Sequence, residues 1–127
     1  MKTLQLKSIS LLLMLGLVVF NSCKKDNPPS AESLAGRWSG KYGQGNQDNS
    51  FTFNLLEGGA LQYIGVNNTV TATGTWEVNG SQVLAIYNFN VNATYKFKGN
   101  YNKLTKKITG VTGEDDDYNS TFFLERE

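Results

Sequence analysis

The fold class of this chain is decided by one stretch, Trp76-Glu77-Val78-Asn79-Gly80-Ser81-Gln82-Val83. Asn-Gly between two runs of alternating apolar and polar residues is the strongest short signal for a β-hairpin, because both turn residues must adopt positive φ angles. Glu57-Gly58-Gly59 and Asn67-Asn68 predict two further tight reversals. From Leu34 onward the chain has no proline and no amphipathic stretch of helical period, so an all-β domain is predicted over residues 34–127.

Short alternating runs separated by turns rich in glycine and asparagine are predicted to form eight strands. They cover residues 37–42, 50–56, 60–66, 70–78, 82–89, 94–101, 106–112 and 119–125. No connection between these runs is long enough for a crossover helix, so each strand is expected to pair antiparallel with the next one. The sequence therefore predicts an eight-stranded antiparallel up-and-down meander.

Glycines beside large residues favour closure of this meander into a small barrel. In five predicted strands a bulky residue and a glycine lie two positions apart, and so share one face: Trp38/Gly40, Tyr63/Gly65, Gly74/Trp76, Phe97/Gly99 and Ile108/Gly110. Glycine inside a strand marks a sharp bend or a close approach, which suits a sheet that closes on itself. An open β-sandwich is the alternative. Strands of about seven residues, tilted by about 40°, would give a barrel about 18 Å tall.

Residues 1–22 are predicted to be a lipoprotein signal peptide. Lys2 and Lys7 accompany an apolar run over residues 9–20, which is too short to span a bilayer and is typical of a secretory signal. The one cysteine of the chain, Cys23, follows this run, so the segment resembles a bacterial lipoprotein signal with a relaxed lipobox. The resemblance implies that Cys23 is diacylated through a glyceryl group and becomes the mature N-terminus. The alternative is an ordinary signal peptide with an incidental cysteine.

The resemblance to lipoproteins also implies a location. Residues 23–33 would form a flexible tether, and the protein would be lipid-anchored in the cell envelope, at the outer membrane. The membrane, reached through acylated Cys23, is then one predicted partner.

A family resemblance begins at Leu34-Ala35-Gly36-Arg37-Trp38. A Gly-x-Trp at the start of the first strand of an eight-stranded meander resembles the lipocalin (calycin) superfamily, and best fits the short lipocalin-like domains of bacterial lipoproteins. The resemblance implies that Gly36, Trp38 and Arg126 form a plug at the closed end of the barrel, with Arg126 packed across Trp38. It also implies a small apolar ligand at the other end.

Aromatic residues supply the candidate ligand site. The aromatic residues predicted to face inward are Trp38, Tyr42, Phe51, Phe53, Tyr63, Trp76, Tyr87, Phe89, Tyr95, Phe97, Tyr101 and Phe122. The predicted ligand-binding residues among them are Tyr63, Trp76, Tyr87, Tyr95 and Tyr101, with the four tyrosines expected away from the Trp38 plug. Their polar atoms would orient an apolar ligand. The alternative is a filled interior, since an eight-stranded barrel holds only side chains or one small ligand.

Charge and residue types exclude several classes of function. The formal net charge of +1 becomes −1 once residues 1–22 are removed, which is unlike a nucleic-acid-binding protein. The chain has no histidine, and its carboxylates lie in turns or at the termini apart from Glu57 and Glu77, so neither catalysis nor a cofactor is expected. The acidic run at residues 114–117 lacks the glycine and glutamate of a calcium-binding EF-hand loop, so no metal site is expected.

The sequence thus predicts a membrane-anchored envelope lipoprotein that binds or carries a small apolar ligand and is not an enzyme. The alternative is a protein- or glycan-interaction module, inhibitor-like or structural, with a filled barrel and an envelope protein as its partner.

Overall fold

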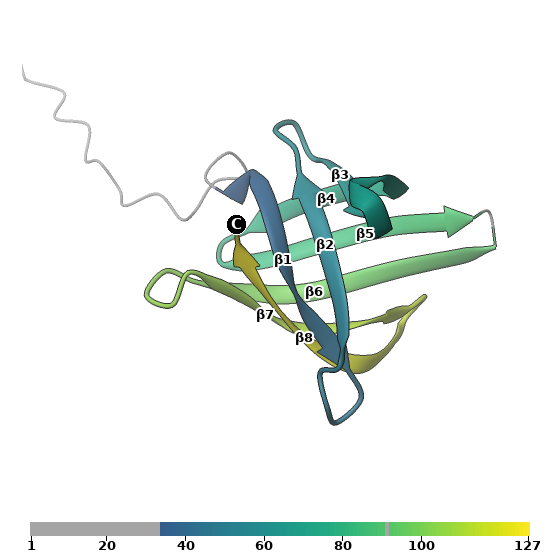
Figure 1. Cartoon of the computed structure of the whole chain (residues 1–127). Helices are drawn as coiled ribbons and strands as arrows, with labels where there is room; N and C mark the ends of the chain where they lie inside the picture. Colours follow the sequence, from purple (N-terminus) through teal and green to yellow (C-terminus); the bar gives the residue numbers. More distant parts are fainter. Residues whose placement is uncertain (1–33, 91) are drawn as a thin grey trace, which may run out of the picture.

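The computed structural model describes residues 34–90 and 92–127, which form eight β-strands (Figure 1). The strands are β1 (Gly36–Gly43), β2 (Asn49–Leu55), β3 (Ala60–Ile64), β4 (Val70–Asn79), β5 (Gln82–Asn90), β6 (Ala93–Asn102), β7 (Lys107–Glu114) and β8 (Asp117–Arg126). A short 3-10 turn, η1 (Val66–Asn68), joins β3 to β4. Each strand begins and ends within two residues of its predicted range. The predicted signal peptide (1–22), Cys23 and the tether (23–33) lie outside the described residues.

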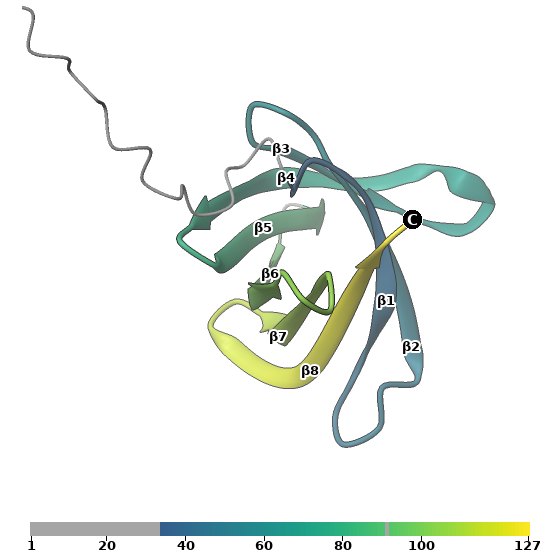
Figure 2. The same ribbon diagram turned by 90° about the vertical axis from the view of Figure 1, so that its left-hand side faces the viewer.

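The meander closes into a barrel, and every neighbouring pair of strands is antiparallel. Closure is made by β8, which pairs with β1 from Trp38 opposite Arg126 to Gly43 opposite Thr121. Figure 2 shows the strands following one another around the molecule until β8 lies beside β1. The predicted closed barrel is confirmed, and the open sandwich is wrong.

Inward-facing aromatic rings fill the middle of the barrel. Phe53, Phe97 and Phe122 are each at most 1% exposed. The ring centroid of Phe97 lies 5.3 Å from that of Phe53 and 5.1 Å from that of Phe122. Burying a side chain of this kind stabilises the folded state by about 1.5–3 kcal/mol, so these rings form the main part of the core.

Close approach of neighbouring strands explains glycines in the predicted pairs. A Cβ atom built on Gly74 of β4 would lie 1.9 Å from the carbonyl oxygen of Ile86 on β5. A Cβ atom on Gly110 of β7 would lie 2.0 Å from the carbonyl oxygen of Lys98 on β6. Neither position has room for a side chain, so the strands bend toward each other there, as a small closed barrel requires.

The two ends of the barrel differ. One end, which we call the closed end, carries Leu34, the start of β1 and the C-terminus (Figure 1). The other end, which we call the mouth, is formed where β1, β3, β5 and β7 finish and β2, β4, β6 and β8 begin. Among the described residues, no helix is long and apolar enough to cross a membrane.

A plug built on Trp38 fills the closed end. Its indole Nε1–H donates a 2.8 Å hydrogen bond to the carbonyl oxygen of Leu34, which is itself fully buried. The guanidinium carbon of Arg126 lies 5.0 Å from the centre of the Trp38 ring, within the range of a cation–π contact. Gly36 has a φ of +141°, which side-chain-bearing residues rarely adopt. Gly36, Trp38 and Arg126 therefore meet at this end.

Candidate functional site

A cup of about 280 Å³ opens at the mouth of the barrel. One wall is aromatic and carries six rings, Tyr42, Phe51, Tyr63, Tyr87, Phe89 and Tyr95. A polar wall comes from β7 and β8 and consists of Thr112, Gly113, Glu114, Asn119 and Ser120. This volume is just below the usual range of about 300–1,000 Å³ for ligand sites, so the cup has room for one small molecule.

Small residues on β4 bring the tyrosines of the aromatic wall together. Tyr63 on β3 pairs with Ala72 on β4, and Gly74 on β4 pairs with Tyr87 on β5. Because β4 presents no large side chain between them, the rings of Tyr63 and Tyr87 stack across it, with centroids 5.7 Å apart. Tyr95 pairs directly with Tyr87 and continues the row at 5.9 Å.

Phe89 packs across this row of tyrosines at the rim of the cup. The pairing of β5 with β6 shifts between Asn88 and Asn90, so Phe89 lies at an irregularity of the ladder. Such irregularities change the direction in which a side chain points. The Phe89 ring is nearly perpendicular to those of Tyr63 and Tyr95, at 4.8 and 5.3 Å. Phe89 is nevertheless 42% exposed, so a ligand entering the cup would cover it.

The polar wall is anchored at Thr112, the one buried polar side chain among the described residues. The Thr112 hydroxyl donates a 2.9 Å hydrogen bond to the carbonyl oxygen of Lys96 on β6. A second register shift, between Thr112 and Glu114, sits at the end of β7. Next to it, Glu114, Asn119 and Ser120 add a carboxylate, an amide and a hydroxyl to the lining of the cup.

Burial keeps Tyr63 and Tyr87 of the cup neutral. The pKa of Tyr87 is raised far above its ordinary value, mainly by burial, and further by the charge that Tyr63, Tyr42 and Tyr95 would carry if ionised. A hydrogen bond with the Thr112 side chain acts in the opposite direction. The pKa of Tyr63 is also raised, first by burial and then by Tyr42. These phenols are therefore hydrogen-bonding groups rather than bases.

The raised pKa of Tyr87 predicts a loss of stability at high pH. Above the pKa of an unfolded tyrosine, about 10, the unfolded chain releases a proton that folded Tyr87 retains, so stability falls as pH rises. Between pH 10 and pH 11 one such group should cost about 1 kcal/mol. Urea unfolding of the Tyr87→Phe variant should show a correspondingly flatter pH dependence. Tyr118→Phe, at the surface, should retain the wild-type slope. Equal slopes for wild type and Tyr87→Phe would contradict this account.

Three of the five predicted ligand-binding residues meet in the cup, and two do not. Tyr63, Tyr87 and Tyr95 line it. Trp76 lies toward the closed end, where its Nε1–H donates a 2.9 Å hydrogen bond to the carbonyl oxygen of Leu56. Tyr101 packs edge-on against Trp38, with ring centroids 6.1 Å apart, so the expectation that it lies away from the plug is wrong.

Distance along the strand explains this difference. Tyr95 and Tyr101 lie on the same face of β6 but are six residues, or about 20 Å, apart. That length spans most of the barrel, so one residue reaches the mouth and the other reaches the plug.

Several residues of the cup were missed as candidate site residues. They are Tyr42, Phe51, Phe89, Thr112, Gly113, Glu114, Asn119 and Ser120. Their common signal is that each lies near the mouth-side end of its strand. Counting how far each residue lies from the turns at the mouth, in addition to its alternation, would have identified the aromatic residues among them.

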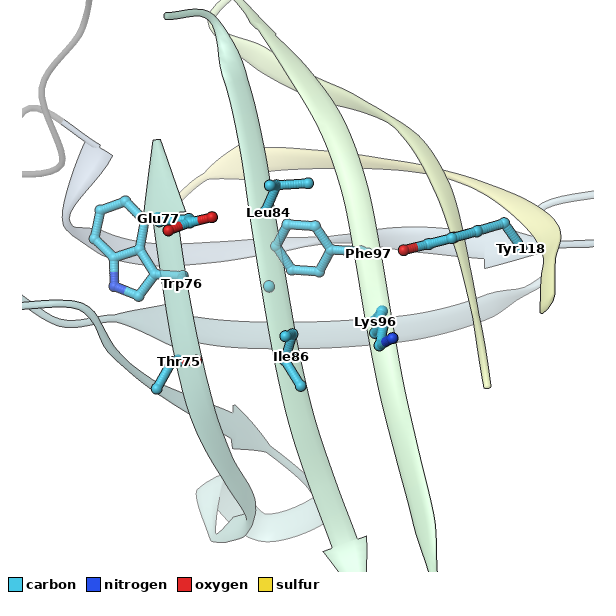
Figure 3. A pocket seen from close by; sticks show the side chains of 9 residues that line it. Thr75, Trp76, Glu77, Leu84, Ile86, Lys96, Phe97 and Tyr118 are labelled. Atoms are coloured by element: carbon cyan, nitrogen blue, oxygen red, sulfur yellow. The ribbon is translucent and has the colours of Figure 1, made fainter. Parts of the chain in front are cut away.

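A second hollow lies on the outside of the barrel and has a volume of about 340 Å³. Figure 3 shows its outward residues, with Thr75 and Glu77 on β4, Leu84 and Ile86 on β5, Lys96 on β6 and Tyr118 on β8, which is separated from β6 by β7. The Lys96 ammonium group is held by Asp116 at 2.8 Å. Trp76, Ala85 and Phe97 also border this outer groove but are buried in the core. The outer groove therefore lies on the outer surface of the sheet, whereas the cup lies at the mouth of the barrel.

Within residues 34–90 and 92–127, no group of three or more histidine, cysteine, aspartate or glutamate side chains is placed to hold a metal ion. Compared with known proteins, the chain matches no family model, no curated protein and no solved structure.

Proposed function

We propose that this protein is a cell-envelope lipoprotein, held at the outer membrane by acylated Cys23, that binds one small and mainly apolar ligand in the cup. The observation that carries the binding proposal is the cup itself. Six aromatic rings and several polar groups line one cavity of about 280 Å³. An apolar lining with a few convergent polar groups is the usual composition of a small-molecule site.

Binding fits this site better than catalysis does. The buried tyrosines have raised pKa values, so they are poor bases and poor nucleophiles at neutral pH. Glu114 is the one carboxylate that lines the cup in the described part of the chain. A lone exposed carboxylate beside neutral phenols offers no acid/base pair, and we propose that the protein is not an enzyme.

The outer groove favours a second candidate function, the binding of a protein or glycan by the barrel surface. Ile86 is 45% exposed there, beside Leu84 and Tyr118. A partner would cover these side chains without entering the barrel. The two functions use opposite faces of β5, so paired substitutions on this strand can separate them.

Replacing Phe89 with alanine should weaken ligand binding about tenfold, because the ligand loses one ring of the aromatic wall. The measurement is a titration by NMR with small neutral probes, indole and 3,3-dimethylbutan-1-ol. Ile86→Ala is the matched control, since Ile86 is on the same strand and is similarly exposed but lines the outer groove. Its probe affinity should equal that of wild type.

Two outcomes would contradict the binding proposal. One is that Ile86→Ala weakens binding while Phe89→Ala does not, which would place the site on the outside of the barrel. The other is that neither these neutral probes nor their charged analogues bind to the wild-type protein.

A further inference from the structure

The residues that line the cup carry negative charge and no positive charge. The mainly apolar ligand proposed above does not account for this negative charge. Glu114 is the one residue with a full charge among those that line the cup, and none of the lining residues is a lysine or arginine. Tyr63 and Tyr87 add no charge at neutral pH, since burial raises the pKa of both phenols. The lining therefore carries a formal charge of −1.

The aromatic wall has the same electrostatic preference as the carboxylate. The faces of aromatic rings carry negative electrostatic potential, and cages of such rings attract organic cations. Four of the six rings are tyrosines, whose hydroxyl oxygens can also accept hydrogen bonds from an N–H group. Glu114 pairs with Tyr95 between β7 and β6, and both line the same small volume, so a cation in the cup would lie close to the carboxylate and to the rings.

The surroundings of the mouth strengthen this preference. Glu114 is followed by Asp115, Asp116 and Asp117 in the turn between β7 and β8. The closest lysine of β6, Lys96, lies on the outside of the barrel and forms a salt bridge with Asp116. That pair offsets one acid of the turn, and the mouth keeps a surplus of negative charge.

We infer that the ligand of the cup is a compact organic cation, a quaternary or tertiary ammonium group on a small apolar body. This inference rests on the proposed ligand-binding function and specifies its ligand class. A carboxylate such as a fatty acid would meet Glu114 and electron-rich rings with no cation to pair with. A neutral apolar molecule would fill the cup but would gain nothing from Glu114.

Three probes of nearly equal shape test the sign of the charge. Choline is cationic, 3,3-dimethylbutan-1-ol is its neutral counterpart, and 3,3-dimethylbutanoate is anionic. The full chain would be titrated by calorimetry in a maltoside detergent, which has no choline headgroup. Choline should bind about tenfold more tightly than the alcohol, since a cation–π contact and a carboxylate together contribute roughly 1–2 kcal/mol. The butanoate should bind more weakly than either.

The Glu114→Gln variant tests whether the Glu114 carboxylate contributes to the binding of the cation. It should lower the affinity for choline about three- to tenfold and leave the affinity for the alcohol unchanged. Glu77→Gln is the matched control, since that carboxylate borders the outer groove, and it should change neither affinity. Because Glu114 is exposed, the variant should fold like the wild type.

The outcomes separate this inference from the proposed function. If the alcohol binds as tightly as choline, the charge preference is refuted while binding in the cup stands. If the butanoate binds best, the sign of the charge is wrong. If none of the three probes binds, the cup is not a site for ligands of this size, and both proposals fail.

Discussion

Replacing Trp38 with alanine is expected to lower the free energy of unfolding by about 3–5 kcal/mol. Small domains are stable by only about 5–15 kcal/mol, so this loss is a large fraction of the total stability. Trp38 is 1% exposed, and its ring contacts both Tyr101 and the guanidinium group of Arg126. The substitution would leave a cavity at the closed end that the curved strands around it cannot fill.

Loss of the indole also removes a hydrogen bond. The carbonyl oxygen of Leu34 accepts the Trp38 Nε1–H, and Leu34 is fully buried. An unpaired buried carbonyl adds about 1–3 kcal/mol to the cost unless water reaches it. Trp38→Phe should therefore recover part of the packing energy but not this hydrogen bond. Its free energy of unfolding should lie between those of the wild type and Trp38→Ala.

Urea unfolding followed by circular dichroism measures this effect. Leu104→Ala is the control, because Leu104 is 94% exposed and contributes no packing, so its stability should stay within about 0.5 kcal/mol of wild type. A loss of less than 1 kcal/mol in Trp38→Ala would show that the plug does not hold the closed end together.

Replacing Cys23 with serine is expected to move the protein from the membrane fraction to the soluble fraction. Two acyl chains anchor a protein stably, since each buried methylene contributes about 0.8 kcal/mol, and serine cannot carry the thioether-linked glyceride. The chain without residues 1–22 has a net charge of −1, so electrostatic attraction to anionic lipids would not replace the lost anchor.

Cell fractionation after a high-salt wash measures this change. Ser22→Ala is the matched control, because it keeps a small residue before the cysteine, and it should remain in the membrane fraction. A Cys23→Ser protein that stays with the membrane after the wash would refute lipid anchoring through this residue.

Most of the fold was predictable from the sequence because the determinants of the turns are local. The β4–β5 hairpin forms as predicted, but its turn is Gly80-Ser81 with Gly80 at a φ of +66°, because Asn79 pairs with Gln82 as the last residue of β4 and the expected positive φ at Asn79 is wrong. Gly58 and Gly59 both adopt positive φ between β2 and β3. A turn of this kind fixes the register of the strands on either side. Closure was predictable for a different reason, because Gly74 and Gly110 stand where neighbouring backbones leave no room for a Cβ atom.

The candidate site was only partly predictable, because alternation along a strand gives the face of a residue but not its height in the barrel. Tyr95 and Tyr101 follow the same alternation and reach opposite ends. The height of a residue in the barrel depends on the tilt of its strand and on the register of several strand pairs. The sequence of a single hairpin reveals neither of these. The polar wall was missed because its residues resemble those of any solvated turn, and the register shift before Glu114 leaves no clear trace in the sequence.

If the chain is anchored through Cys23, as proposed, the position of Leu34 bears on the side from which a ligand would arrive. Leu34 lies beside Trp38 at the closed end, and the C-terminal Glu127 lies there too, with its N–H bonded to the carbonyl oxygen of Arg37 at 3.0 Å. A lipid anchor at Cys23, as proposed, would be joined to the barrel at its closed end, so the mouth would lie at the far end of the barrel from the point of attachment. This arrangement would favour uptake of molecules from the surrounding water over extraction of lipids from the bilayer.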